Sequence, residues 1–247
     1  MRIIAWNIRA GGGTRAGAIA RQIIRWAPDI VALSEFRATL PSRTLAAVLA
    51  ASHLPHQLTT AGAASPNANA LLIASRWPLR RLRLRASPSV RHRWLAASVD
   101  APQPFAVGAM HVPNRAEGNK YPFLDAVLTC ARGWRLGPAL FVGDTNSGRR
   151  GLDEAVPAFN AIEEGWIDRL AGCGWADAFR HLRPDARAYT WYSPNGANGF
   201  RIDQAFVNAP LLARLKDAAY LWGGASRRGR RALLSDHAAL LVDLAET

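Results

Sequence analysis

The sequence predicts an α/β protein in which stacked β-sheets form the core and a few helices cover their outer faces. Short apolar runs rich in β-branched residues recur along the chain, as strands do, whereas segments with helical spacing are few. Hydrophobic side chains make up 49% of the 247 residues, which is enough to bury one substantial core. No long linker, internal repeat or low-complexity tail divides the chain, so we expect a single domain over residues 1–247.

Apolar runs predict strands at Ile3–Trp6, Ile30–Leu33, Ala70–Ala74, Leu95–Val99, Phe105–Met110, Ala139–Val142 and Ile202–Val207. Gly, Pro and Asn cluster next to these runs, as expected of loops, at residues 11–13, 65–69, 112–119, 147–151 and 193–199. Helical spacing and stop signals predict helices at Thr14–Trp26, Ser42–Ala51 and Tyr121–Arg132.

The two cysteines, Cys130 and Cys173, are too few for a disulfide framework and lack the spacing of a zinc site. This usage fits a reducing compartment. The apolar run that ends at Trp6 is too short for the core of a signal peptide, and no apolar stretch of about 18 residues follows it. We therefore expect a soluble, cytoplasmic protein with no membrane span.

Basic residues strongly outnumber acidic ones. Lys and Arg total 31 and Asp and Glu total 18, which gives a net charge of +13 and a field that concentrates polyanions at the surface. Because 29 of the 31 basic residues are Arg in an Ala-rich chain, genome composition also explains such an excess, and composition alone leaves nucleic-acid binding open. The distribution is more informative, since Phe36–Val99 contains nine Arg and no Asp or Glu. One part of the surface should be positive throughout.

Polar side chains stand at the ends of the predicted strands and in a short C-terminal segment, where sheets present catalytic groups. These residues are Asn7, Glu35, His111, Asp144, Asn146, Asp203, Asp236 and His237. Carboxylates and amide oxygens are hard ligands suited to Mg²⁺ or Mn²⁺, and an Asp and His pair can stabilise charge on phosphorus. Taken singly, such residues are more often turns, caps or surface acids. Together they predict hydrolysis of a phosphate ester.

In their order and spacing these motifs resemble the endonuclease/exonuclease/phosphatase superfamily of divalent-metal phosphodiesterases, which includes exonuclease III, abasic-site endonucleases, DNase I, sphingomyelinases and inositol polyphosphate 5-phosphatases. The resemblance spans almost the whole chain. It rests on Ala5-Trp6-Asn7-Ile8, Ser34-Glu35, Asn69 through Ser75-Arg76-Trp77-Pro78, His111-Val112-Pro113-Asn114, Gly143-Asp144-Thr145-Asn146, Thr190-Trp191 with Arg201-Ile202-Asp203, and Ser235-Asp236-His237.

The resemblance implies a DNase I-like fold, a four-layer α/β/β/α sandwich of two packed mixed sheets flanked by helices. The active site would lie at one edge, where loops from both sheets meet. The resemblance also implies a site for Mg²⁺ or Mn²⁺ in which Glu35 is the principal ligand, Asn7 lies beside it, and Asp236 completes the site directly or through water.

The remaining residues receive catalytic roles from the same resemblance. Asp144, supported by Asn146, would align or deprotonate the attacking water. His237, paired to Asp203, would stabilise the charge that gathers on phosphorus. His111 would contact a phosphate oxygen or assist the leaving group.

Two positions depart from the pattern of abasic-site endonucleases and exonuclease III. Arg9 stands where those enzymes continue from Asn to an Asp, so a second acidic metal ligand is absent. His111 stands where they carry Tyr, as it does in the DNase I, sphingomyelinase and phosphatase branches. Conversely, Trp191, Phe200 and Ile202 fall near positions that form an apolar slot for an extrahelical sugar in abasic-site enzymes, although core packing would equally account for Trp191.

Substrate-binding residues are expected around the same edge. Arg76 and Asn114 belong to the matched motifs, and Trp191 and Phe200 to the apolar slot. A compact basic loop at residues 226–231 comes just before Asp236 and should border the site. Its candidate phosphate-binding residues are Arg227, Arg228 and Arg230.

A second basic row lies at Arg81, Arg83 and Arg85, which alternate with leucines. A strand here would project the three guanidinium groups from one face, followed along the chain by Arg91 and Arg93. Such a row could track a phosphate backbone, although solvated surface arginine is the more common explanation of any one of them.

The leading hypothesis is a divalent-metal-dependent phosphodiester hydrolase, a nuclease acting on DNA in abasic-site or 3′-end processing, with RNA as a further substrate. A second hypothesis is a phosphatase or phosphodiesterase for a phosphoinositide, a sphingolipid or another small phosphate ester, which His111 would also suit. A third, motivated by Arg9, is a basic nucleic-acid-binding protein with a decayed site. The expected partner is nucleic acid, DNA before RNA, and no obligate protein partner is indicated.

Overall fold

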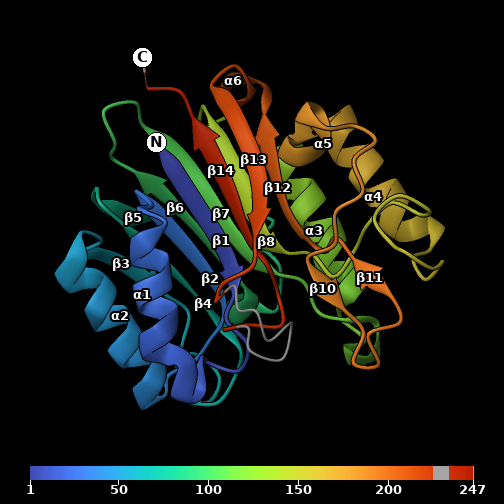
Figure 1. Ribbon diagram of the computed structural model, residues 1–247. Helices are drawn as coiled ribbons and strands as arrows, with labels where there is room; N and C mark the ends of the chain where they lie inside the picture. The colour runs from blue at the N-terminus through green and yellow to red at the C-terminus, as the bar shows by residue number, and fades with distance from the viewer. Residues whose placement is uncertain (225–233, 247) are drawn as a thin grey trace.

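Two six-stranded sheets pack face to face in the computed structural model of the chain, and helices cover the outer face of each (Figure 1). The structure describes residues 1–224 and 234–246. The first sheet has the strand order β13-β14-β1-β2-β4-β3, and the second has the order β5-β6-β7-β8-β12-β9. This arrangement confirms the expected four-layer α/β/β/α sandwich.

The strands of the first sheet are β1 (Arg2–Asn7), β2 (Ile30–Phe36), β3 (His56–Thr59), β4 (Ala70–Ser75), β13 (Leu215–Leu221) and β14 (Ala239–Leu244). Those of the second sheet are β5 (Leu79–Arg81), β6 (Trp94–Val99), β7 (Phe105–His111), β8 (Ala139–Asp144), β9 (Trp175–Asp177) and β12 (Asp203–Asn208). A small hairpin pairs β10 (Trp191–Tyr192) with β11 (Gly199–Phe200).

The α-helices are α1 (Ala16–Arg25), α2 (Leu40–Ser52), α3 (Lys120–Arg132), α4 (Ala161–Gly172), α5 (Ala178–Leu182) and α6 (Ala209–Leu212). Short 3-10 turns are η1 (Gly13–Arg15), η2 (Arg91–Arg93) and η3 (Arg115–Glu117). None of the helices in the described part of the chain combines the length and the apolar character that crossing a bilayer requires.

The central strands are buried on both faces, which explains why they read in the sequence as continuous apolar runs. In β1, Ile3 and Ala5 pack into the cluster between the two sheets, whereas Ile4 and Trp6 pack with residues of α1 and α2. The second sheet is covered in the same way by α3 and α4, whose apolar faces supply Phe123 and other residues to a third cluster. Three apolar interfaces therefore hold four layers together.

Most of the predicted elements are present, with ends that differ by a few residues, but helices α4, α5 and α6 and strands β3, β9, β10, β11 and β13 were not predicted. Helix α4 has a signal that the sequence contains: Asn160 caps it by accepting from the backbone N–H of Glu163 (3.1 Å), and the Glu163 carboxylate accepts from the backbone N–H of Asn160 (3.0 Å). The strand expected through Arg85 is wrong, because β5 ends at Arg81.

Each sheet contains one parallel pair of strands, β1 with β2 and β7 with β8, and every other named pair is antiparallel. Parallel neighbours end at the same edge of a sheet. In each sheet, the two strands of the parallel pair therefore end at the same edge, and the residues that follow them lie there too.

A buried ion-pair cluster fixes the chain just ahead of β12. Arg201 is fully buried and donates hydrogen bonds to both oxygens of Asp153 (2.7 and 3.0 Å) and to Asp177 (2.6 Å). Arg180 approaches Asp153 from another side, with 3.2 Å between Nε and Oδ1. Two carboxylates thus neutralise two buried guanidinium groups, as charges inside a protein require. Because Arg201 precedes Asp203 by two residues, the cluster also fixes where β12 begins.

We predict that Asp153→Ala lowers the free energy of unfolding by about 3–5 kcal/mol, because it leaves buried guanidinium charges without a partner. Urea denaturation followed by circular dichroism measures this change. Asp168→Ala is the matched control, since it removes an acid from a largely exposed ion pair with Arg149 and should cost less than about 1 kcal/mol. Equal midpoints for the two variants would show that the buried cluster contributes no special stability.

Candidate active site

Polar side chains gather at the edge of the sandwich where the two parallel pairs end. Asn7 and Glu35 lie at the carboxyl ends of β1 and β2, and His111 and Asp144 are the last residues of β7 and β8. Asp203 arrives from the opposite direction, because the antiparallel β12 begins directly beside Asp144. The contact between Asn7 and Asp144 (3.0 Å) joins the two sheets at this edge.

The C-terminal segment adds His237 to the same edge. It lies two residues before β14, which runs antiparallel to β1, and a backbone bridge links it to Trp191. Ser235 ties this segment down by donating its hydroxyl hydrogen to the carbonyl oxygen of Asn7 (2.6 Å). The structure therefore unites the two groups of polar residues that lie far apart in the sequence.

Asp144 is the centre of the arrangement. Its Oδ2 accepts from the Asn7 amide (3.0 Å) and lies 3.7 Å from Nε2 of His111 and 4.0 Å from Nε2 of His237. Its Oδ1 accepts from the backbone N–H of Asn146 (3.0 Å). The side chain is buried, and burial together with the nearby Asp203 charge raises the pKa of Asp144 above its usual value.

The backbone around Asp144 has little freedom. Gly143 has a φ of 142°, and a Cβ on it would lie 2.0 Å from the carbonyl oxygen of Met110, so any side chain there would collide with β7. Asn146 occupies the left-handed region with a φ of 46° and donates its amide to the carbonyl oxygen of Val112 (2.8 Å). The ammonium group of Lys120 donates to the carbonyl oxygen of Asn146. The loop is therefore held on both sides of Asp144.

Asp203 and His237 form a buried pair, with 2.9 Å between Oδ2 of Asp203 and Nδ1 of His237. Burial alone lowers the pKa of an imidazole, but the charges of Asp203, Asp144 and Asp236 outweigh it here and raise the pKa of His237 to about 9. His237 therefore carries a positive charge at neutral pH, with its Nε2 on the side of Asp144.

Glu35 presents a carboxylate whose position is set by an irregular backbone. It has a φ of 55° and coincides with a register shift between β2 and β4. Oε1 accepts from the Asn7 amide (3.3 Å), and Oε2 accepts from the backbone N–H of Ala10 (2.7 Å). Burial opposes ionisation, but the Ala10 N–H, the His111 charge and the Asn7 amide outweigh it and lower the pKa of Glu35.

Glu35 offers an ionised carboxylate, the kind of ligand that a hard divalent cation prefers, and the Asn7 side chain lies beside it. Asn7 turns its amide nitrogen toward Glu35, and its Oδ1 accepts from the backbone N–H of Arg9 (3.0 Å). Asp144, Asp203 and His237 also place one potential ligand atom each within 4.8 Å of one another. That second group is a poor cation site, since the Nδ1 of His237 is engaged by Asp203 and the ring is positively charged. The geometry favours Glu35 as the principal ligand.

Asp236 lies at the outer margin of the site. Its Oδ2 is 3.4 Å from the indole nitrogen of Trp191 and 3.8 Å from Nε of Arg9. Arg9, which stands where an acid was expected, therefore lies beside Asp236, the acid that was predicted to complete the metal site. Arg15 lies within range of the charges of both Glu35 and Asp236. Two guanidinium groups therefore flank the carboxylates at the margin.

His111 is buried, and burial lowers its pKa. Its only acidic neighbour within 4 Å among the described residues is Asp144, which it faces through Nε2. The Nδ1 atom is also buried and has no hydrogen-bond partner within the part of the chain that the structure describes. An imidazole that faces a buried carboxylate can donate one hydrogen bond to an oxygen placed between them.

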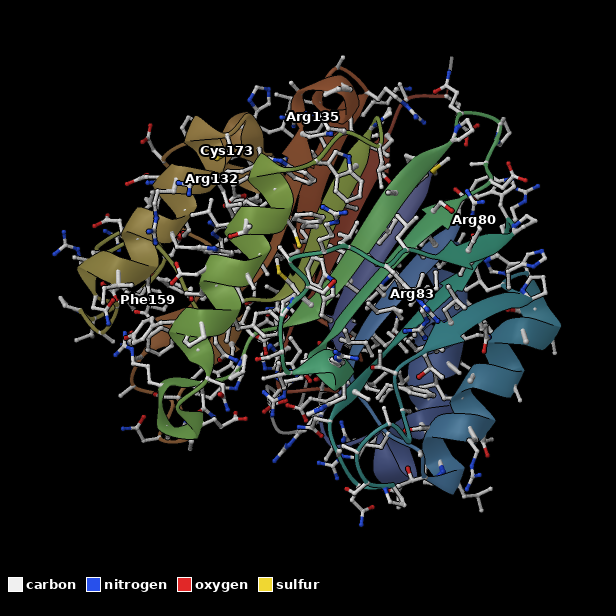
Figure 2. All side chains as sticks on the ribbon, turned by 180° about the vertical axis from the view of Figure 1, so that it is seen from behind. Arg80, Arg83, Arg132, Arg135, Phe159 and Cys173 are labelled. Carbon is white, nitrogen blue, oxygen red and sulfur yellow. The ribbon has the colours of Figure 1, made fainter. Side chains whose placement is uncertain are left out.

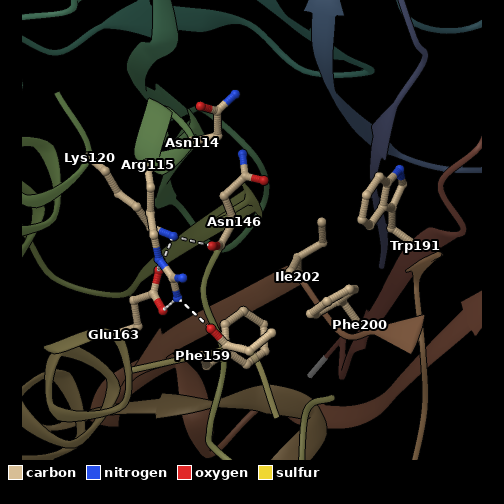
Figure 3. A pocket seen from close by; sticks show the side chains of 10 residues that line it. Asn114, Arg115, Lys120, Asn146, Phe159, Glu163, Trp191, Phe200 and Ile202 are labelled. Carbon is tan, nitrogen blue, oxygen red and sulfur yellow. Dashed lines mark hydrogen bonds and ion pairs between the residues drawn. The ribbon is translucent and has the colours of Figure 1, made fainter. Parts of the chain in front are cut away.

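A recess of about 220 Å³ opens beside this group of residues (Figure 3). Trp191, Phe200 and Ile202 form its apolar wall, and Phe159 packs edge-on against Phe200 with 5.5 Å between ring centroids. Asn114 and Asn146 lie on the opposite, polar side, and Figure 3 shows their side chains close together. The three residues predicted to form an apolar slot therefore line one recess.

Sequence reasoning missed the residues that form the polar floor of the recess. Lys120 and Arg115 both bind the buried carboxylate of Glu163, and Figure 3 shows the three side chains together at one side. Burial lowers the pKa of Lys120. The capping box at Asn160 and Glu163 is a helix-start signal that could have placed Glu163 at the head of α4, but nothing in the sequence shows which cations it meets.

The structure does not bring every candidate to the site. Arg76 follows β4, whose last residue, Ser75, pairs with Ile30 at the start of β2, so Arg76 lies at the opposite edge of the sheet. There it pairs with Asp29 (3.5 Å) and stacks on Trp77. The loop candidates Arg227, Arg228 and Arg230 lie outside the described residues.

Carboxylates, amides and imidazoles converging at one edge of a two-sheet sandwich define a hydrolytic site of the phosphoesterase type. The sequence profile of the Endonuclease/Exonuclease/phosphatase family matches residues 4–237, and the chain belongs to this family. No curated protein matches the chain by sequence.

Solved structures share the fold. The 3′ phosphatase NExo from Neisseria, bound to a product DNA hairpin, is 23% identical, with a TM-score of 0.81 over 100% of both chains. An AP endonuclease from Archaeoglobus fulgidus is 19% identical, also with a TM-score of 0.81 over 100% of both chains. The APE2 catalytic domain of Xenopus laevis is 16% identical, with a TM-score of 0.75 over 99% of this chain and 91% of that one. At these identities the likeness establishes the fold.

We predict that Asp203→Asn lowers the pKa of His237 from about 9 by about 1 to 3 pH units, because the variant removes the charge closest to the ring. Titration of the imidazole Cε1–H signals by NMR measures this. Since the folded-state pKa lies above the ordinary value of about 6.5, the pair stabilises the fold below that pH and loses its contribution as the pH rises through about 9. An unchanged titration in the variant would rule out the Asp203 charge as the cause.

Proposed function

We propose that the protein is a divalent-metal-dependent phosphoesterase that acts on DNA at abasic sites or at 3′ ends. The observation that carries the proposal is the position of Asp144, whose Oδ2 contacts Asn7 and faces His111 and His237 within 4.0 Å. A buried carboxylate, a charged imidazole and a carboxylate suited to a cation are the groups that hydrolysis of a phosphate ester uses.

Glu35 would be the principal ligand of the cation, because its carboxylate is ionised, and Asn7 beside it would bind through its Oδ1, which now accepts from the backbone N–H of Arg9. A bound Mg²⁺ or Mn²⁺ would supply neutralisation of negative charge on the phosphate oxygens. The backbone N–H of Ala10 and the amide of Asn7 keep the Glu35 carboxylate oriented. Asp236 lies farther out beside Arg9, where it would contribute charge at the margin.

Asp144 would orient the attacking water and accept its proton. Its raised pKa makes it a stronger base than an exposed Asp. Oδ1 of Asp144 accepts a hydrogen bond from the backbone N–H of Asn146, so Oδ2 is the oxygen that would face the reacting groups. His237 carries its charge on the same side and would donate from Nε2 to a phosphate oxygen as negative charge builds up there.

The recess beside the site favours DNA over small esters. Its wall of Trp191, Phe200 and Ile202 suits the apolar face of a deoxyribose, and Asn114 and Asn146 offer amides for a phosphate or a hydroxyl group. The similar structures include a 3′ phosphatase bound to a DNA hairpin and an AP endonuclease, which supports the same class of substrate. The net charge of +13 would attract a polyanion.

We predict that Asp144→Asn lowers kcat by about 10²- to 10⁴-fold, because the amide cannot accept the proton of water. The assay uses labelled DNA carrying either an abasic site or a 3′-phosphate, with Mg²⁺, with Mn²⁺ and with EDTA. A circular dichroism spectrum and DNA binding like those of the wild type would control for misfolding. Full activity of the variant, or of the wild type in EDTA, would refute the mechanism.

A second variant tests the recess. We predict that Phe200→Ala lowers kcat/KM for abasic DNA by about tenfold, because the variant removes roughly 1.5 kcal/mol of apolar stabilisation of the sugar. Hydrolysis of bis(p-nitrophenyl) phosphate, which is too small to need the recess, serves as the internal control and should stay unchanged. If both substrates respond equally, the recess does not select DNA.

The competing hypothesis of a small phosphate ester as substrate draws on His111 at the site. The same assay separates the two, using inositol phosphates and sphingomyelin alongside the labelled DNA. Turnover of those esters that exceeds turnover of DNA in kcat/KM would overturn the DNA proposal and leave the catalytic residues in place.

A further inference from the structure

The second sheet carries an open groove on its outer side, over β5 and β6. The groove has a volume of about 710 Å³ and runs along residues 81–96, where Leu82, Leu84 and Trp94 form its floor. Helices α3 and α4 cover the other part of this sheet, and Figure 2 shows Arg80 and Arg83 on the part over which no helix of the described chain lies. The catalytic residues lie outside the groove.

The rim of the groove is positively charged and carries no acid. Arg83, Arg85 and Arg91 are exposed, and their guanidinium groups have no acidic or hydrogen-bonding partner among the described residues. This differs from Arg93, which is paired with Glu117 at 2.7 Å. Three guanidinium groups side by side repel one another, and an anion in the groove relieves that repulsion.

The spacing of the rim suits a linear anion. Leu82 and Leu84 are half-buried and pack against the apolar cluster on the outer face of this sheet, whereas Arg83 and Arg85 are exposed. Arg83 and Arg85 are two residues apart and Arg91 lines the same groove, so the three guanidinium groups can contact separate phosphates of one strand. An isolated phosphate or a small ester would engage one or two of them.

An unsatisfied donor in the lining of the groove is a second, independent observation. The indole nitrogen of Trp94 is buried and has no hydrogen-bond partner in the described ranges 1–224 and 234–246. Trp94 is 6% exposed and lines the groove. Buried donors usually have a partner, and an oxygen of a ligand in the groove would supply one.

The groove also begins next to the catalytic edge. Trp94 is the first residue of β6 and pairs with Met110, which immediately precedes His111. Arg93 joins the same end of the groove to η3 through Glu117, and Asn114 at the recess caps that turn. A strand bound at the recess therefore has a short route to the arginine rim.

We propose that this groove binds the sugar–phosphate backbone of a nucleic-acid strand that flanks the scissile phosphate. That the bound polymer is a nucleic acid rests on the proposed function. Arg83, Arg85 and Arg91 bind successive phosphates, and the apolar floor lies beneath the sugars. The groove thereby extends the catalytic site into a track that favours long substrates without reading their sequence.

The test compares two triple variants of equal charge. Arg83→Gln with Arg85→Gln and Arg91→Gln removes the rim, and the control replaces three exposed arginines far from it, as Arg21→Gln with Arg25→Gln and Arg132→Gln. Fluorescence anisotropy in EDTA follows binding of single strands of about 6 and about 40 nucleotides over a range of salt. Equal thermal midpoints of the two variants establish that both are folded.

We expect the rim variant to bind the long strand at least about tenfold more weakly than the control, with a salt slope smaller by about 0.7 for each phosphate that the variant no longer binds. Binding of the short strand should match the control. Identical affinities and slopes of the two variants would overturn the proposal, as would an equal loss for both strand lengths. Because binding is measured without a cation, a wild type that hydrolyses no DNA would sink the proposed function and leave the groove test intact.

Discussion

The site depends on the burial of one carboxylate at a place where two sheets meet. Burying an ionised Asp costs several kcal/mol unless donors surround it. Asn7 from the first sheet, the N–H of Asn146, and the imidazoles of His111 and His237 stand around Asp144 from different directions. The absence of a side chain at Gly143 allows the backbone to approach β7 closely enough for this.

Topology explains why these donors can converge. The parallel pair in each sheet brings two carboxyl ends to one edge, and β12 and the segment before β14 return to the same edge from the opposite direction. The buried cluster of Arg201, Asp153 and Asp177 then fixes the entry to β12. Residues 200–202 thus combine two roles, since Phe200 and Ile202 line the recess and Arg201 between them is held by the buried ion pairs.

Charge is divided between two regions that perform different tasks. The catalytic edge combines buried acids with imidazoles, so its electrostatics depend on short distances and on exclusion of water. The charged groups of the rim over β5 and β6 are exposed arginines, and their effect on a polyanion is screened by salt. A substrate that spans both regions would be bound more tightly by the rim and hydrolysed at the edge. Binding and turnover would then depend on different residues.

The sequence by itself determined the fold class, most central strands and the polar residues that the fold brings to one edge, because runs buried on both faces and polar residues at strand ends leave clear local patterns. It could not place Arg76, whose motif matches the family although β4 carries it to the opposite edge. It also could not reveal that Lys120 and Arg115 share Glu163, or that residues 82–85 leave the sheet. Those features depend on contacts between residues far apart in the chain, and only the packing of the layers decides which distant charges become neighbours.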